Sequence, residues 1–234
     1  MKRFYKIVTI ARAPGGFEIH LDGKPVKMPS GATLCVPNEA LATAVMLEWA
    51  GQETDIIPDS MPLTQILITG HDRVGRERAA MERAVLGYLD TDLLCYRATL
   101  PVETAKRQAE TWNPWLQWFE KKFSVRLHTT ENLQAIAQPP EAHAAVRDAV
   151  GRMDDLRFTV TQMVVSQSGS LVLGLAFAAG AVSPEQVIAA AHVEEGFKAE
   201  VYHENVHGLA PNEEKRRAGM LRDLNAAREF LRLL

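Results

Sequence analysis

Two histidines and a glutamate near the end of the chain have the spacing of a zinc peptidase motif. His203, Glu204 and His207 form a His-Glu-x-x-His pattern. On a helix, histidines four residues apart can reach one metal ion, and the glutamate can act as a general base. A catalytic zinc needs a third protein ligand, and the acids after His207 stand at no convincing spacing for one. A zinc metallopeptidase is therefore the alternative hypothesis for the function.

The same stretch carries a second pattern, which favours binding over catalysis. Glu195, Lys198 and Tyr202 are spaced i, i+3 and i+7, so on a helix they lie close together. They fall beside an apolar stripe formed by Val187, Ala190, Val193, Phe197 and Val201. Such an edge is either a solvated, salt-bridged helix face or a contact surface for a partner protein, and the residues alone leave both open.

Composition and charge exclude several classes of protein. The chain has 234 residues, 47% of them hydrophobic, and a net charge of -3, which makes nucleic acid a poor default partner. Cys35 and Cys95 stand far apart among apolar residues, which indicates free buried thiols in a reducing compartment. We expect no membrane segment, because no apolar run approaches about 20 residues. We also expect no signal peptide, because the basic N-terminus has no apolar core of signal-peptide length and no small-residue cleavage site. The sequence therefore predicts a cytoplasmic protein.

The first part of the chain is predicted to be a small α+β domain, residues 1–100. Residues 4–36 alternate like strands, with a tight hairpin at Asp22-Gly23. Asn38 is expected to cap a helix, and Met61-Pro62 to open a second one. The apolar run at residues 93–98, LLCYRA, has the length of a strand and is expected to return to the sheet.

The rest of the chain, residues 101–234, is predicted to be an all-α helical bundle. Trp112, Trp115 and Trp118 recur every third residue, so we expect an aromatic ridge buried between helices. Residues 170–181 are apolar on all sides, which is typical of a helix at the centre of a bundle. Further helices are expected over 154–168, from Ser183 to about His207, and from Glu213 to Leu234.

Several blocks of the sequence, taken in order, resemble one family. The blocks are FEIHLDGKPVK at 17–27, Glu48-Trp49 with Gln52, MPLT at 61–64, TDLLCYRA at 91–98, SGSL at 168–171, and the helix with Glu194-Glu195. In this order and spacing they resemble the assembly chaperones of the ATP synthase F1 sector that handle the alpha subunit, the assembly factor 2 type. The resemblance covers nearly the whole chain.

The resemblance implies a molecular chaperone and not an enzyme. Members bind the unassembled alpha subunit and shield the surface that it later offers to the beta subunit, which then replaces the chaperone. They need no nucleotide, metal or other cofactor. The resemblance also implies a β-containing N-terminal domain and a helical C-terminal domain. We expect a monomer without membrane insertion, and for eukaryotic relatives a mitochondrial matrix location.

The resemblance places the contact with the partner near the end of the chain. The acidic position of the family falls on Glu195, so we expect the partner-binding residues to be Glu194, Glu195, Lys198 and Tyr202. The sequence departs from the family just after this glutamate. Members usually show Gln and then Trp-Gly, where this chain has Lys198 and then Tyr202-His203. The zinc-like motif thus occupies a substituted family position.

Overall fold

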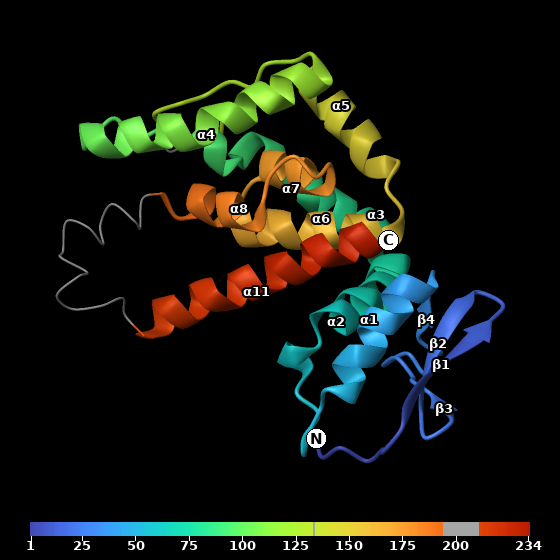
Figure 1. Cartoon of the computed structure of the whole chain (residues 1–234). Coiled ribbons are helices and arrows are strands. Elements are labelled where there is room, and N and C mark those ends of the chain that lie inside the picture. Colours follow the sequence, from blue (N-terminus) through green and yellow to red (C-terminus); the bar gives the residue numbers. More distant parts are fainter. Residues whose placement is uncertain (133, 194–210) are drawn as a thin grey trace. The chain divides into compact units, whose positions relative to one another are not determined.

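The computed structural model of this chain describes residues 1–132, 134–193 and 211–234 (Figure 1). These residues form two compact units that are interleaved in the sequence. The first unit contains Met1–Arg78, Asp155–Thr159 and Ala226–Leu234, and the second contains Ala79–Asp154 and Val160–Asn225. The separate domains predicted over 1–100 and 101–234 stay a prediction.

The first unit contains a small antiparallel sheet. Its strands are β1 (Val8–Ala13), β2 (Gly16–Leu21), β3 (Lys24–Pro25) and β4 (Cys35–Val36). Strand β2 lies in the middle and pairs with β1 on one side and with β3 and β4 on the other. The predicted hairpin is confirmed, because Asp22 and Gly23 both have positive φ, 50° and 80°, in the turn between β2 and β3.

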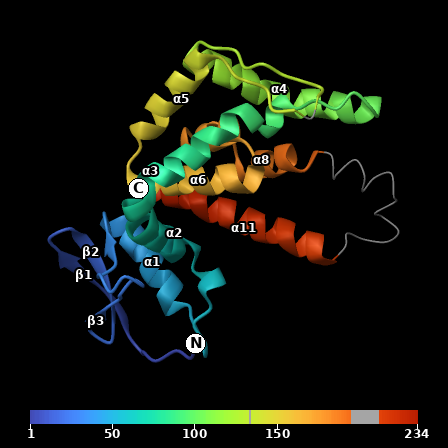
Figure 2. The same cartoon turned by 180° about the vertical axis from the view of Figure 1, so that it is seen from behind.

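Helix α1 (Glu39–Ala50) packs against this sheet, as Figure 2 shows from behind. The predicted cap is confirmed, since the Asn38 side chain accepts a hydrogen bond from the Leu41 amide at 2.9 Å. Trp49 is buried on the inner face of α1, and its carbonyl accepts a hydrogen bond from the Tyr5 hydroxyl at 2.7 Å. The sheet and α1 therefore share one core.

After α1 the chain is helical in several pieces of different type. Short 3-10 turns lie at Pro58–Ser60, Tyr88–Thr91 and Leu93–Cys95. Helix α2 (Pro62–Ile68) passes into a π-helical segment at Thr69–Val74 and then into α3 (Gly75–Gly87). At Gly70 a Cβ atom would lie 2.6 Å from a Leu156 methyl carbon, so only glycine permits this approach. The absence of one regular helix here agrees with the glycines in the sequence.

The second unit is helical. Its elements are α4 (Val102–Phe123), α5 (Pro140–Gly151), most of α6 (Asp155–Ser168), α7 (Leu171–Ala178), α8 (Pro184–Ala191) and the first part of α11 (Pro211–Leu233). Helix α7 is buried from Leu171 to Phe177, and it lies among α4, α6 and α8 in Figure 1. The predicted central helix is confirmed, and with the sheet of the first unit this gives the predicted α+β fold class.

One prediction about an element is wrong, and a second is tested only in part. Residues 93–98 do not return to the sheet: Leu93–Cys95 is a 3-10 turn, and Tyr96 makes only an isolated bridge to Thr130. The helix expected from Ser183 to about His207 is interrupted, since α8 ends at Ala191 and His192 leaves the helical conformation at φ -118° and ψ 22°. The part of that expectation from residue 194 onward lies outside the described residues. The capping box of Ser183 and Gln186 at its start is present as expected.

The buried side chains agree with most of the expectations, with two exceptions. Trp112 is fully buried and its indole N–H donates to the Ala190 carbonyl at 2.8 Å, but Trp115 and Trp118 are only half-buried. Cys95 is a buried free thiol, whereas Cys35 is free but only half-buried. Among the described residues, no helix is long and apolar enough to cross a membrane.

Candidate partner-binding site

The residues predicted to contact a partner lie outside the described residues. These are Glu194, Glu195, Lys198 and Tyr202, and the zinc-like set His203, Glu204 and His207 lies there too. The structure describes the chain on both sides of this stretch, where α8 ends at Ala191 and α11 begins at Pro211. The described residues that adjoin the predicted site are therefore the end of α8 and the start of α11.

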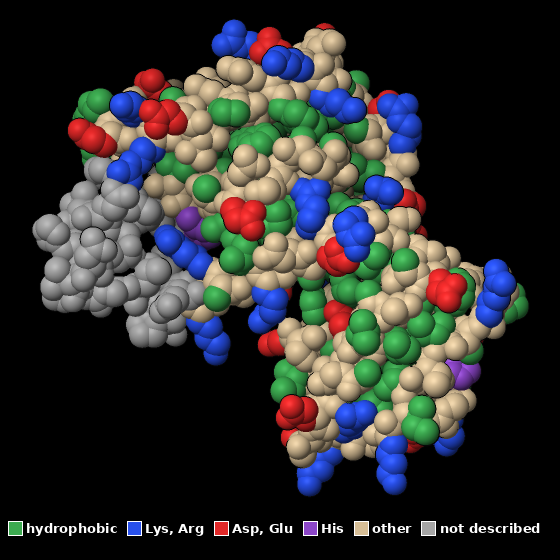
Figure 3. Space-filling view, viewed as in Figure 1, with side chains coloured by type: hydrophobic (Ala, Val, Ile, Leu, Met, Phe, Trp, Pro, Cys, Tyr) green, Lys and Arg blue, Asp and Glu red, His purple; other side chains and the backbone are tan. Residues whose placement is uncertain are grey.

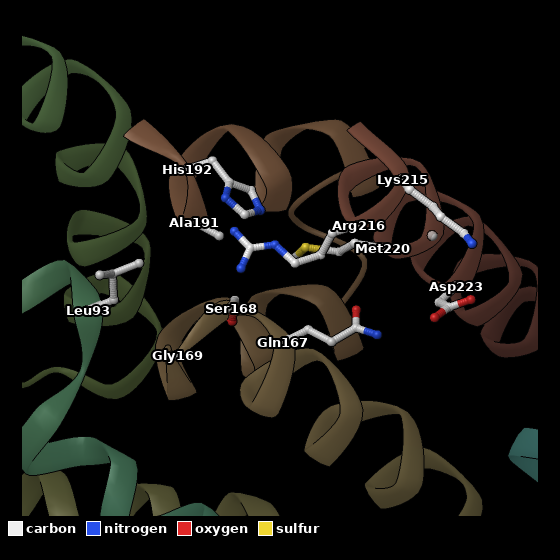
Figure 4. Close-up of a pocket in the computed structure, with 11 residues that line it drawn as sticks. Leu93, Gln167, Ser168, Gly169, Ala191, His192, Lys215, Arg216, Met220 and Asp223 are labelled. Carbon is white, nitrogen blue, oxygen red and sulfur yellow. The ribbon is translucent and has the colours of Figure 1, made fainter. Parts of the chain in front are cut away.

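A pocket of about 570 Å³ lies in the helical unit, at the end of α8 and the first part of α11 (Figure 4). Its wall combines the turn after Asp92, the end of α6, the end of α8 and one face of α11. The lining residues are Leu93, Gln167, Ser168, Gly169, Ala191, His192, Lys215, Arg216, Gly219, Met220 and Asp223. Elements that are far apart in the sequence therefore meet around one cavity.

One wall of this pocket is fixed by the buried carboxylate of Asp92. Its Oδ1 accepts hydrogen bonds from the Ser170 hydroxyl at 2.8 Å and the Leu94 amide at 3.1 Å, and its Oδ2 accepts from the Val172 amide at 2.9 Å. The Leu93 amide also donates to the Gly169 carbonyl at 3.0 Å. Asp92 thus ties the 3-10 turn to the start of α7 and holds Leu93 and Gly169 side by side in the pocket wall.

The environment of Asp92 disfavours its charge. Burial raises the pKa of this carboxyl from 3.8 to about 6, although the hydrogen bonds from Val172, Ser170 and Leu94 act in the opposite direction. An amide pair at a helix start is also a favourable place for a carboxylate, because the first amides of a helix have no partner inside it. The acid is therefore a structural cap of α7, and it has no access to the pocket's contents.

The opposite wall brings positive charge and apolar surface together. Lys215 and Arg216 are exposed on α11, and the Arg216 side chain extends toward His192 in Figure 4. Met220 and Leu93 supply apolar surface. Gln167 Oε1 is buried and has no hydrogen-bond partner among the described residues. The pocket suits an apolar side chain that carries a polar group.

The described part of the pocket offers no site for metal chemistry. Among the residues that the structure describes, no three His, Cys, Asp or Glu side chains are grouped so that they could hold a metal ion. The charged side chains Lys215, Arg216 and Asp223 that line the pocket all come from one helix, α11.

A second cluster, in the first unit, joins two of the sequence blocks through Glu48. Its Oε1 accepts a hydrogen bond from the Leu63 amide at 2.7 Å, and its Oε2 accepts from the amide and hydroxyl of Thr64 at 2.8 and 2.7 Å. Burial raises the pKa of Glu48, and the hydrogen bonds from Thr64 and Leu63 oppose this. Met61 stands at the N-cap position of α2 but makes no side-chain hydrogen bond there, so Glu48 caps this helix instead.

Sequence patterns identified part of this site and missed part of it. The blocks TDLLCYRA and SGSL were noticed for their resemblance, and the structure brings them together at Asp92 and Ser170. Lys215, Arg216 and Gln167 carried no signal of their own. The basic pair stood in a run of charges that predicts only a solvated helix, and a single glutamine at a helix end has no pattern at all.

The comparisons with known proteins agree with one another. A family model described as ATP12 chaperone protein matches residues 2–120. The mitochondrial protein atp12 of Schizosaccharomyces pombe is 26% identical over 205 residues, 82% of this chain and 70% of that protein. The crystal structure of Atp12 from Paracoccus denitrificans matches with a TM-score of 0.90 and 30% identity, over 99% of this chain and 97% of that one.

A further solved structure is similar over the same length. It is a candidate chaperone from Agrobacterium tumefaciens, with a TM-score of 0.90 and 34% identity over 99% of this chain and 85% of that one. These matches name chaperones or Atp12 proteins, and they give the zinc metallopeptidase hypothesis no support.

Proposed function

This chain belongs to the ATP12 chaperone family, and from that membership we propose that it binds the unassembled alpha subunit of ATP synthase F1. It would shield the surface by which alpha later contacts the beta subunit, until beta replaces it. The coarser role, a chaperone of ATP synthase assembly, follows from the family itself. The observation that carries the proposal is the match of the family model to residues 2–120.

The proposed contact surface combines the predicted residues with the described pocket. Glu194, Glu195, Lys198 and Tyr202 are the first candidates, and they stand directly after α8, whose end lines the pocket. A partner side chain in the pocket would meet apolar Leu93 and Met220 and the positive charge of Arg216. A mixed apolar and polar surface suits a partner that must later be released, because affinity depends on a few well-packed contacts.

The proposal includes three further expectations. The protein works without a cofactor, it has no enzymatic activity, and it acts as a monomer. Its compartment stays a prediction: cytoplasmic in a bacterium, and mitochondrial in eukaryotic relatives such as the protein from Schizosaccharomyces pombe, whose name states that location.

The test is suppression of alpha-subunit aggregation, followed by light scattering after dilution from denaturant. The wild-type protein should suppress scattering at about one chaperone per alpha subunit, and added beta subunit should displace it into an alpha–beta complex on gel filtration. Glu195→Lys should lose the suppression, while Glu131→Lys, on a surface loop, should keep it. If the wild type does not bind alpha at all, the proposed client is wrong.

The same preparation decides the alternative. Metal analysis of the purified protein should find no stoichiometric zinc, and Glu204→Gln should leave chaperone activity unchanged. Stoichiometric zinc, together with a peptidase activity that Glu204→Gln removes, would establish the metallopeptidase instead.

A further inference from the structure

Strand β1 forms one complete edge of the sheet in the first unit. It pairs only with β2, in an unbroken register from Val8↔Leu21 to Ala13↔Gly16, while β3 and β4 occupy the other side of β2. Among the described residues, no strand pairs with the outer side of β1. The open edge is six residues long, which is the usual length of a complete strand.

Two hydrogen bonds establish which backbone groups face outward. The Asp22 amide donates to the Ile7 carbonyl at 2.9 Å, so Ile7 bonds inward, toward β2. The Val26 amide donates to the Ile19 carbonyl at 2.8 Å, so Ile19 bonds toward β3 and leaves its partner Ile10 unbonded. Inward and outward residues alternate in an antiparallel ladder. The N–H and C=O groups of Val8, Ile10 and Arg12 therefore point away from the sheet.

Side chains at this edge are incompletely covered. Val8 and Ile10 lie on the α1 face opposite Leu21 and Ile19, which are buried, yet they are themselves only half-buried. Just before the strand, Phe4 and Ile7 are 67% and 63% exposed. The strand contains no proline and no bulge, two devices that commonly block an edge. An added strand would cover Val8 and Ile10 and complete this side of the core.

Charge distinguishes between the strands that could be added. The first 13 residues contain Lys2, Arg3, Lys6 and Arg12 and no acidic residue, and Figure 3 shows Lys and Arg side chains gathered at one end of the sheet unit. In an antiparallel pair of two β1 strands centred on Thr9, Lys6 of each copy would stand directly opposite Arg12 of the other, where like charges are destabilising. An acidic strand would gain from the same charges. The edge thus opposes self-association and favours an acidic partner.

We infer that the outer edge of β1 takes up an extended segment of the client ATP synthase subunit as an additional strand. Val8, Ile10 and Arg12 share one face of β1, because every second side chain of a strand points the same way. The segment would therefore place apolar side chains beside Val8 and Ile10, and an Asp or Glu at each end, near Lys6 and Arg12. Main-chain hydrogen bonds supply the affinity in this mode of recognition, and alternate side chains supply the specificity. The inference rests on the proposed function, because the client is identified through it.

The first experiment measures backbone amide exchange in the full-length protein, alone and with purified F1 alpha subunit. The amides of Val8, Ile10 and Arg12 should exchange at least about 10-fold more slowly in the complex, because they become hydrogen-bonded. The amides of Thr9 and Ala11 already bond to β2 and should change little. A complex that leaves all three outward amides unchanged would overturn the inference and leave the proposed function intact.

A designed peptide separates failure of the edge from failure of the client. The probe is an acetylated peptide with Val at two central, alternate positions and Glu at both ends, compared with the same peptide carrying Lys in place of Glu. The acidic peptide should bind and slow the same three amides, and the basic one should not. If alpha does not bind but the acidic peptide does, the edge is correct and the client is another protein. If neither binds, both parts of the inference fail.

The decisive variant is Val8→Pro, with Val8→Ala as its matched control. Proline removes the outward N–H of Val8 and adds bulk at the edge, and it is tolerated there because Val8 is the first residue of the strand and its N–H is not in the ladder. Both variants lose the valine side chain, but only Val8→Pro should weaken peptide binding, by about 10-fold. Equal binding by the two variants would contradict the inference.

Charge reversal tests the proposed chemistry without touching the ladder. Lys6→Glu with Arg12→Glu changes two exposed side chains and should exchange the preference, so that the Lys peptide now binds better than the Glu peptide. An unchanged preference would show that charge does not select the strand. Sedimentation of the wild type alone completes the test: a dimer that Val8→Pro dissociates would make a second copy the occupant and overturn the inference.

Discussion

The buried carboxylate of Asp92 holds together two segments nearly 80 residues apart. It accepts hydrogen bonds from two main-chain amides and from the Ser170 hydroxyl, and all of these donors are buried. Asp92→Ala leaves three donors unsatisfied, so we expect the free energy of unfolding in urea at pH 7 to fall by about 3–5 kcal/mol. Asp59→Ala, at an exposed 3-10 turn, should change it by less than about 0.5 kcal/mol.

The same residue predicts a pH dependence with a definite sign. Burial raises the pKa of Asp92 from 3.8 to about 6, so between these values the folded protein holds a proton that the unfolded chain has lost. The stability that this proton contributes is complete below the lower value and is lost as the pH rises through about 6. Relative to Asp92→Asn, the wild type should therefore lose about 3 kcal/mol between about pH 4 and pH 7. If the difference between the urea midpoints of the wild type and Asp92→Asn is the same at both pH values, this prediction is wrong.

Residue types alone could not reveal these caps. Asn38 was predictable because a cap at the position just before its helix has a local pattern. Glu48 caps α2 from the preceding helix, and Asp92 caps α7 from a turn far upstream. Each acid is therefore distant in the sequence from the amides that donate hydrogen bonds to it. Only the family resemblance marked both acids. It did not indicate that Glu48 contacts the MPLT block or that Asp92 contacts the SGSL block.

At the scale of elements, the approach of α7 to α6 depends on Gly174. A Cβ atom there would lie 2.4 Å from a Val165 methyl carbon and 3.2 Å from the Thr161 carbonyl oxygen. Gly174→Ala must therefore push the helices apart, and we expect a loss of about 1–3 kcal/mol in the free energy of unfolding. Gly151→Ala meets nothing within 4 Å and should be neutral or stabilising by up to about 1 kcal/mol. Equal effects of the two substitutions on the melting temperature would argue against close packing at Gly174.

The wrong prediction at residues 93–98 has a physical reason. A short apolar run is compatible with a buried strand or with any other buried segment, and periodicity cannot distinguish them. Asp92 decides the outcome, because its carboxylate accepts a hydrogen bond from the Leu94 amide and so caps a 3-10 turn at Leu93–Cys95. The end of α8 at His192 was hidden for a similar reason, since the helical pattern continues past it in the sequence.

At the scale of the whole molecule, pattern and composition predicted the kinds of element but not their grouping. The hairpin at Asp22-Gly23, the helix after Asn38 and the buried α7 all follow from local chemistry. The pocket needs α6, α8 and α11 to converge, and no local pattern encodes that convergence. Nor does the sequence indicate that the last residues of α11 belong to the same compact unit as the sheet.

That grouping makes the C-terminal end important for the stability of the N-terminal sheet. Ala226–Leu234 belongs to the first unit, Phe230 is fully buried, and the Asn38 side chain donates to the Leu233 carbonyl at 2.7 Å. Phe230→Ala should lower the free energy of unfolding by about 3–5 kcal/mol, because it removes a fully buried ring. It should speed amide exchange in β2 more than in α7, because only β2 shares a compact unit with Phe230.

A surface substitution on the same turn separates packing from charge. Arg232→Ala removes an exposed ion pair with Glu229, which is worth less than about 1 kcal/mol, and should leave exchange in β2 unchanged. If Phe230→Ala instead accelerates exchange in α7 and β2 equally, the two units unfold as one cooperative body. The separate domains predicted over 1–100 and 101–234 would then have no independent stability, and a chaperone surface on one unit would be sensitive to substitutions in the other.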